Sequence, residues 1–128
     1  MEGTKNYQLS TSVNEGILEI VFAGEVTKNT VENIHTDAIT IIREQTPRAI
    51  LSDIRALNGR YEDFIEAFFR TREMPQHVKT IPSVVVDTSK NKAFQSFYET
   101  TAANVGITIK WFHEIEPARA WLKSKIQE

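Results

Sequence analysis

The sequence predicts an α/β fold with a mainly parallel sheet, and three observations support that class. Short apolar or alternating runs mark five strands, at 7–13, 17–23, 49–54, 83–86 and 107–112. Apolar residues at helical spacing mark four helices, one after each of the last four strands. The resulting order, β-β-α-β-α-β-α-β-α, alternates strictly after the first strand, which is typical of parallel strands joined by right-handed crossovers.

The first two strands are expected to form an antiparallel hairpin at one edge of the sheet. Residues 7–13 alternate in polarity, as a strand with one buried face does. Asn14-Glu15-Gly16 follows as a tight turn, because glycine adopts positive φ without strain. The second strand places three apolar residues on one face: Leu18, Ile20 and Phe22.

The remaining elements follow from caps, breakers and periodicity. Thr27, Asn29 and Thr30 are candidate caps for the first helix, which ends before Pro47. The second helix begins near Tyr61, and a connector between Pro75 and Pro82 leads to the buried strand at 83–86. Thr88 or Ser89 is the expected cap of the third helix, and Pro117 lies in the first turn of the last.

Composition favours one domain over residues 1–128 and excludes several classes of protein. The chain has no cysteine, so disulfide scaffolds, thiolate zinc sites and cysteine nucleophiles are excluded. The net charge is −2, with acidic and basic residues interspersed, which disfavours nucleic acid as a partner. The N-terminus does not resemble a signal peptide and no apolar run is long enough for a membrane span, so a cytoplasmic location is expected.

Three motifs resemble those of one protein family. Gly24-Glu25-Val26-Thr27 resembles the G-x-V-T entry to the first helix of SpoIIAA-like proteins, which belong to the STAS superfamily. Residues 52–55, Ser-Asp-Ile-Arg, resemble their third strand. Trp111-Phe112 followed by Ala118-x-x-Trp121-Leu122 resembles their C-terminal segment. The resemblance covers nearly the whole chain and implies a STAS-like fold with most helices on one face of the sheet.

The same resemblance implies a binding or regulatory role rather than an enzyme. Well-understood members are partner-binding switches that are phosphorylated on a serine after the third strand. Residues 55–60, Arg-Ala-Leu-Asn-Gly-Arg, contain no serine or threonine, so this chain departs from that switch. Other SpoIIAA-like proteins are compared with lipid carriers, which implies an apolar ligand.

Four polar residues are expected at the carboxyl ends of the strands, the rim where open α/β sheets bind ligands: Glu25, Asp53, Asp87 and His113. Carboxylates and an imidazole brought together there would suit acid–base catalysis of a small molecule, which is the alternative enzymatic hypothesis. The plainer interpretation is that such residues cap helices or bind water.

A second candidate site is the polar run Thr88-Ser89-Lys90-Asn91-Lys92. Hydroxyls and lysines at a helix N-terminus suit a phosphate or carboxylate, although the run lacks the glycines of a P-loop. The alternative is an ordinary helix cap beside solvated lysines.

A third candidate is aromatic. Tyr61, Phe64, Phe68 and Phe69 share one helical stripe, and Phe94, Phe97 and Tyr98 share another. Both stripes suit the core, but the first is wide enough to border an apolar pocket or a dimer interface. His35, His77 and His113 have no ligand spacing, so neither a metal nor any other cofactor is expected.

The favoured function is therefore a non-catalytic module that binds a protein partner or a small apolar or anionic ligand. The candidate binding residues, with none assigned as catalytic, are Asp53, Arg55, Tyr61, Phe64, Phe68, Asp87, Thr88, Ser89, Lys90 and His113. A third hypothesis is a subunit that only assembles, for example as a homodimer, through the aromatic helix or the last strand, where Lys110 would weaken strand pairing.

Overall fold

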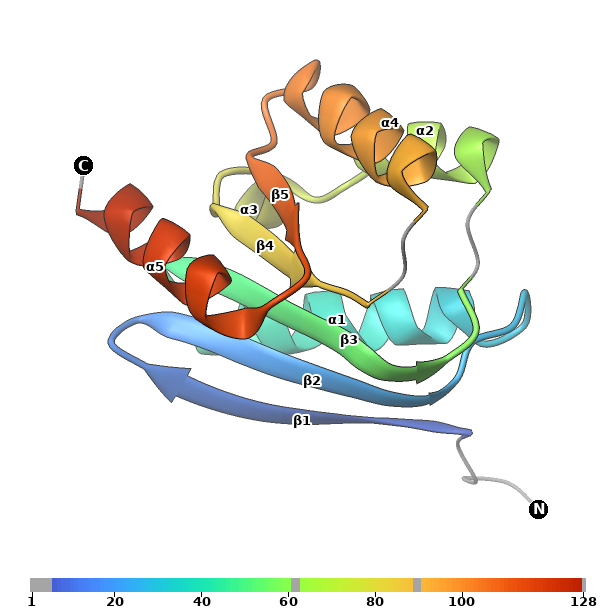
Figure 1. Ribbon diagram of the computed structural model, residues 1–128, viewed down its shortest axis with the longest axis horizontal. Helices are drawn as coiled ribbons and strands as arrows, with labels where there is room; N and C mark the ends of the chain where they lie inside the picture. The colour runs from blue at the N-terminus through green and yellow to red at the C-terminus, as the bar shows by residue number, and fades with distance from the viewer. Residues whose placement is uncertain (1–5, 61–62, 89–90, 128) are drawn as a thin grey trace.

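The computed structural model describes residues 6–60, 63–88 and 91–127. One sheet contains the five strands β1 (Tyr7–Asn14), β2 (Ile17–Glu25), β3 (Ala49–Asn58), β4 (Ser83–Val86) and β5 (Ile109–Phe112) (Figure 1). The helices of the described residues are α1 (Val31–Gln45), α2 (Phe64–Arg72), α3 (Gln76–Lys79), α4 (Lys92–Ala103) and α5 (Ile115–Ile126).

The sheet confirms the predicted class. Its strands lie in the order of the chain, from β1 to β5, with β1 antiparallel to β2 and every other neighbouring pair parallel. Right-handed crossovers between sequential neighbours place all the connecting helices on one face of a sheet. Helix α5 does not connect two strands of this sheet, and it covers the opposite face (Figure 1).

Two elements differ from the sequence-based expectation of four helices and short strands. The connector after Pro75 contains α3, a single turn in which the Pro75 carbonyl accepts from Val78 N at 2.9 Å. A single turn is too short to show helical periodicity, which explains why the pattern missed it. Strand β3 continues past Ile54 to Asn58, because it pairs again with β2 beyond a register shift.

The helix caps were also predicted only in part. The cap of α4 is Asn91, whose side chain accepts from Phe94 N at 3.2 Å, rather than Thr88 or Ser89. The cap of α2 is Asp63, which accepts from Ile65 N and Glu66 N, so this helix begins after Tyr61.

Gly24, the first residue of the G-x-V-T motif, has a backbone reason to be glycine. Its φ is +113°, and a Cβ at this position would collide with the backbone of Asn6 and Tyr7 at the start of β1. Only glycine allows so close an approach between strands at positive φ.

Each face of the sheet carries its own apolar cluster. Toward α1 and α3, the buried residues include Leu18, Ile20, Phe22, Ile34, Ile42, Ile50 and Val78. Toward α5, they are Ile17, Ala49, Leu51, Val84, Val86, Ala118 and Leu122. Among the described residues, no helix is both long and apolar enough to cross a bilayer.

Candidate functional site

A cavity of about 410 Å³ lies between the sheet and the helices α1, α2 and α4. Ligand pockets commonly fall between about 300 and 1,000 Å³, so the space suits a small molecule. Its apolar wall draws on strands and helices alike and includes Phe22, Val31, Ile34, Ile39, Ile50, Ile54, Ala67, Met74, Val85, Phe94 and Ile109.

The cavity exists because α2 packs on α4, while α1 packs on β2 and α3 (Figure 1). One inward-facing residue of α2 has a small side chain: Ala67 is buried and lines the cavity. Strand β3 likewise places the small side chain of Ser52 on this wall, between Ile50 and Ile54. Small residues on facing elements leave the space that larger side chains would fill.

Strand β5 contributes a polar group to this wall. Ile109 and Trp111 face the cavity, since alternate residues of a strand share one side. The backbone N–H of Trp111 donates to Glu99 Oε2 at 2.7 Å. In contrast, the indole Nε1 of Trp111 is buried and has no hydrogen-bond partner among the described residues. A buried donor without an acceptor typically destabilises a fold by about 1–3 kcal/mol.

Tyr98 lies beside this indole. The two rings meet edge to face with their centroids 5.3 Å apart. Burial raises the pKa of the Tyr98 hydroxyl, so the side chain stays protonated and neutral. Within the described part of the chain, no hydrogen bond engages this hydroxyl, and Tyr98 also lines the cavity. Trp111 and Tyr98 therefore place two neutral polar groups side by side on a largely apolar wall.

The α1 side of the cavity contains His35 and Arg70. Burial lowers the pKa of His35 to about 4, and the nearby Arg70 guanidinium acts in the same direction, while Glu32 opposes it. The imidazole is thus neutral at pH 7. Arg70 pairs with Glu32 at 2.9 Å and with Glu66 at 3.1 Å, so its charge is compensated by two carboxylates.

Asp87 and His113 of the expected rim do meet. Asp87 follows β4, is 2% exposed and borders the cavity. Its Oδ1 accepts from Arg60 Nη2 at 2.9 Å and from Nε at 3.2 Å, and its backbone carbonyl lies 3.0 Å from His113 Nδ1. Arg60 also donates to the carbonyls of Ile54, Leu57 and Gly59. The Arg60 guanidinium therefore links the end of β3 to Asp87, which follows β4, and each of its nitrogens donates a hydrogen bond.

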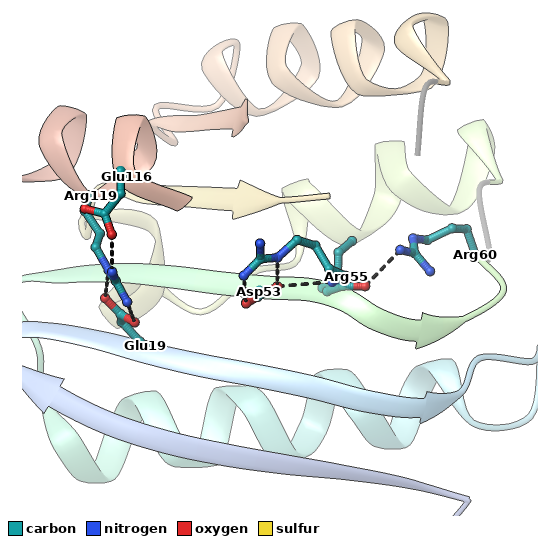
Figure 2. A network of polar contacts seen from close by, with 7 residues as sticks. Glu19, Asp53, Arg55, Arg60, Glu116 and Arg119 are labelled. Carbon is teal, nitrogen blue, oxygen red and sulfur yellow. Dashed lines mark hydrogen bonds and ion pairs between the residues drawn. The ribbon is translucent and has the colours of Figure 1, made fainter. Parts of the chain in front are cut away.

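Asp53 lies elsewhere, on the α5 face of the sheet. It alternates with Leu51 within β3 and is not at the strand end, because β3 extends to Asn58. Its carboxylate accepts from Arg55 Nε at 2.9 Å and Nη2 at 2.8 Å (Figure 2). These hydrogen bonds lower the pKa of Asp53, against the effect of burial. Asp53 and Asp87 therefore do not converge on one rim site.

A second arginine reinforces this face near α5. Arg119 binds Glu19 through Nε at 2.7 Å and Nη2 at 2.9 Å, and binds Glu116 at 2.6 Å (Figure 2). Hydrogen bonding to Glu19 raises the pKa of Arg119. These contacts join α5 to β2. Because Arg119 is already paired with two carboxylates, it does not offer an open site for an anion.

The aromatic candidates separate in the structure. Phe94 and Tyr98 line the cavity, whereas Phe68 and Phe69 are 36% and 55% exposed. Arg72 covers the Phe68 ring, with its Cζ 4.1 Å from the ring centroid. The exposed side of α2, with Ile65 alongside, remains a predicted partner surface.

Several candidates cannot be placed. Tyr61, Ser89 and Lys90, like the side chain of Phe64, lie outside the described residues, so the anion site that includes them stays a prediction. Thr88 is exposed. Over the ranges that the structure describes, no group of three or more acidic or histidine side chains is arranged to hold a metal.

These features define an α/β domain with a cavity between one sheet face and its crossover helices. The profile of the SpoIIAA-like family matches residues 17–123, and the chain belongs to that family. Two solved structures are similar in fold. An anti-sigma factor antagonist from Mycobacterium paratuberculosis is 11% identical, with a TM-score of 0.57 over 91% of this chain and 94% of that one.

The second is an uncharacterized protein from Shewanella loihica PV-4, of the DUF3478 family and with a SpoIIAA-like fold. It is 13% identical, with a TM-score of 0.56 over 95% of this chain and 98% of that one. At these identities the likeness is one of fold. A search of curated proteins gave no match.

Proposed function

We propose that this chain is a non-catalytic binding module that holds a small, largely apolar molecule between the sheet and α1, α2 and α4. The observation that carries the proposal is the cavity of about 410 Å³ with apolar walls. A largely apolar pocket of this size lies in the range that small-molecule sites commonly have.

The state of the polar residues supports binding over catalysis. Asp53 and Asp87 lie on opposite faces of the sheet, and each is held by an arginine. A catalytic pair would instead need carboxyl groups that reach one substrate. His35 borders the cavity, and among the described residues no carboxylate forms a hydrogen bond that would orient it as a base.

The experiment is a titration of the purified protein with 1-aminoanthracene, a neutral apolar dye that becomes brighter in an apolar site. We expect saturable binding with one site per chain. Ala67→Leu should weaken it by about tenfold or more, because the added carbons enter the cavity and displace the dye.

Ala120→Leu is the matched control, since Ala120 is exposed on α5, outside the cavity. It should bind the dye as the wild type does. Absence of saturable binding to the wild type, or equal binding by Ala67→Leu, would refute the proposal.

A further inference from the structure

The charges and donors on the cavity wall restrict what the ligand can be. Among the described residues, the wall includes five carboxylates and two guanidinium groups, an excess of three negative charges. The carboxylates are those of Glu32, Asp63, Glu66, Glu73 and Asp87. An anionic ligand that entered this cavity would meet net repulsion, which solvent screens at Glu32 and Glu66 because their side chains are 68% and 41% exposed.

Neither guanidinium is available to offset that repulsion. Arg60 is used by Asp87 and by three backbone carbonyls. Arg70 is used by Glu32 and Glu66. The wall contains no lysine among the described residues. A fatty-acid-like carboxylate would therefore find no compensating cation among the described residues of the wall.

One donor on the wall is the indole N–H of Trp111, beside others such as the hydroxyl of Ser52 and the neutral ring of His35. Indole has a donor and no acceptor, and this one is buried without a partner in the described structure while its side chain lines the cavity. A ligand oxygen that accepts from it would relieve an unsatisfied group as well as add a hydrogen bond. The neighbouring Tyr98 hydroxyl is a second neutral group at the same end of the wall.

We propose that the cavity selects a neutral, mostly apolar molecule with a carbonyl-type oxygen, which accepts a hydrogen bond from the indole N–H of Trp111. Ketones, esters and amides belong to this class, whereas carboxylates and plain hydrocarbons bind less tightly. The inference rests on the proposed function, since it names the chemistry of the molecule that the cavity holds.

Three probes of similar shape separate the possibilities: 1-acetylnaphthalene, 1-ethylnaphthalene and 1-naphthoate. Each competes with 1-aminoanthracene, and the displacement gives its Kd. The ketone should bind about tenfold more tightly than the ethyl compound, as one relieved buried donor provides. The naphthoate should bind most weakly.

Trp111→Phe removes the N–H and keeps an aromatic ring. It should abolish the preference for the ketone while the Kd of 1-ethylnaphthalene changes by less than about twofold. Trp121→Phe, on the α5 face, should keep the preference. A preference that survives Trp111→Phe would contradict the assignment of this donor.

A spectroscopic readout in the Trp121→Phe protein avoids dependence on the folding of Trp111→Phe. Its single indole proton signal belongs to Trp111 and should move downfield with 1-acetylnaphthalene but not with 1-ethylnaphthalene. Equal Kd values for these two probes, or tightest binding of the naphthoate, would overturn the inference and leave the proposed function standing. Failure of all three probes and of the dye would overturn the proposed function itself.

Discussion

The two faces of the sheet differ in how closely the helices pack against them. On the α5 face, Leu51, Val84, Ala118 and Leu122 are completely buried, and the helix lies directly on β3 and β4. On the other face, the crossover helices leave a cavity of about 410 Å³. The same sheet therefore supports a solid core on one side and a hollow one on the other.

We propose that the two faces divide stability and ligand binding between them. Helix α5 places Ala118 toward the sheet, and a small residue allows close approach without a void. Helix α2 also has a small residue, Ala67, facing inward. Because α2 packs on α4 and not on the sheet, the small side chain borders the cavity. The solid face holds the sheet, and the hollow face is available for a ligand.

The largest expected effect contrasts two large-to-small substitutions. Leu122→Ala in the solid core should lower the free energy of unfolding by about 3 kcal/mol, because it creates a new void. Ile39→Ala at the cavity wall should lower it by about 1 kcal/mol, because that side chain already borders empty space. Urea denaturation measures both. Equal losses would mean that the two faces are packed alike.

The second prediction concerns acid. His35 has a pKa near 4 in the folded chain and about 6.5 when unfolded. Between these values the unfolded chain binds the additional proton, so stability falls as the pH decreases from 6.5 to 4. The loss from this residue is on the order of 3 kcal/mol at most.

Urea denaturation at pH 7 and pH 4.5 tests this with two variants. His35→Gln should have a shallower pH dependence than the wild type. His113→Gln, which changes an exposed ring, is the comparison variant. Parallel curves for the wild type and His35→Gln would show that the imidazole is not held neutral by its surroundings.

The third prediction compares small-to-large substitutions on the two faces of the sheet. Ala118→Leu should destabilise the chain by about 2 kcal/mol, because the packed core must deform. Ala67→Leu should change stability by less than about 1 kcal/mol, because its side chain enters the cavity. Thermal unfolding by circular dichroism compares them. A larger loss for Ala67→Leu would contradict the existence of usable space beside α2.

The smallest effect is expected in the ion pairs of the α5 face. Asp53→Asn should lower stability at pH 7 by about 1 kcal/mol, since Arg55 loses a charged partner but is 39% exposed. The pKa of Asp53 is lowered in the folded chain, so its contribution is present above about pH 4 and is lost below that.

Glu116→Gln provides the comparison for that substitution. Glu116 is 77% exposed, so its pairing with Arg119 should contribute less than about 0.5 kcal/mol. Chemical denaturation at pH 7 and pH 3 distinguishes the two carboxylates. A difference between wild type and Asp53→Asn that persists unchanged at pH 3 would argue against a role for the charge.

Much of the fold was accessible from the sequence because its signals are local. The alternation in β1, the apolar run of β4 and the stripe of α5 each specify an element by itself. Helix α3 was missed because one turn has no period, and the end of β3 was missed because Ala56 and Leu57 are strand residues only through pairing with β2.

The candidate site was less accessible, since a cavity is a property of packing between elements. The sequence predicted Phe94 and Tyr98 as apolar-face residues, but not that space remains beside them. The sequence predicts Trp111 only as a strand residue of the C-terminal motif. Its alternation with Ile109 along the same strand is the signal that could have placed both on one face. Asp53 was expected at a strand end, and only the pairing beyond the register shift moves it into the middle of β3.

The most direct test of the account is a map of where a neutral apolar ligand binds. Amide signals of the ¹⁵N-labelled protein are recorded by NMR while 1-acetylnaphthalene is added. The account predicts shifts concentrated at cavity residues such as Ile39, Ala67, Phe94 and Trp111, with Ala118 and Leu122 on the solid face unchanged. Shifts confined to the exposed side of α2, or no shifts at all, would contradict it.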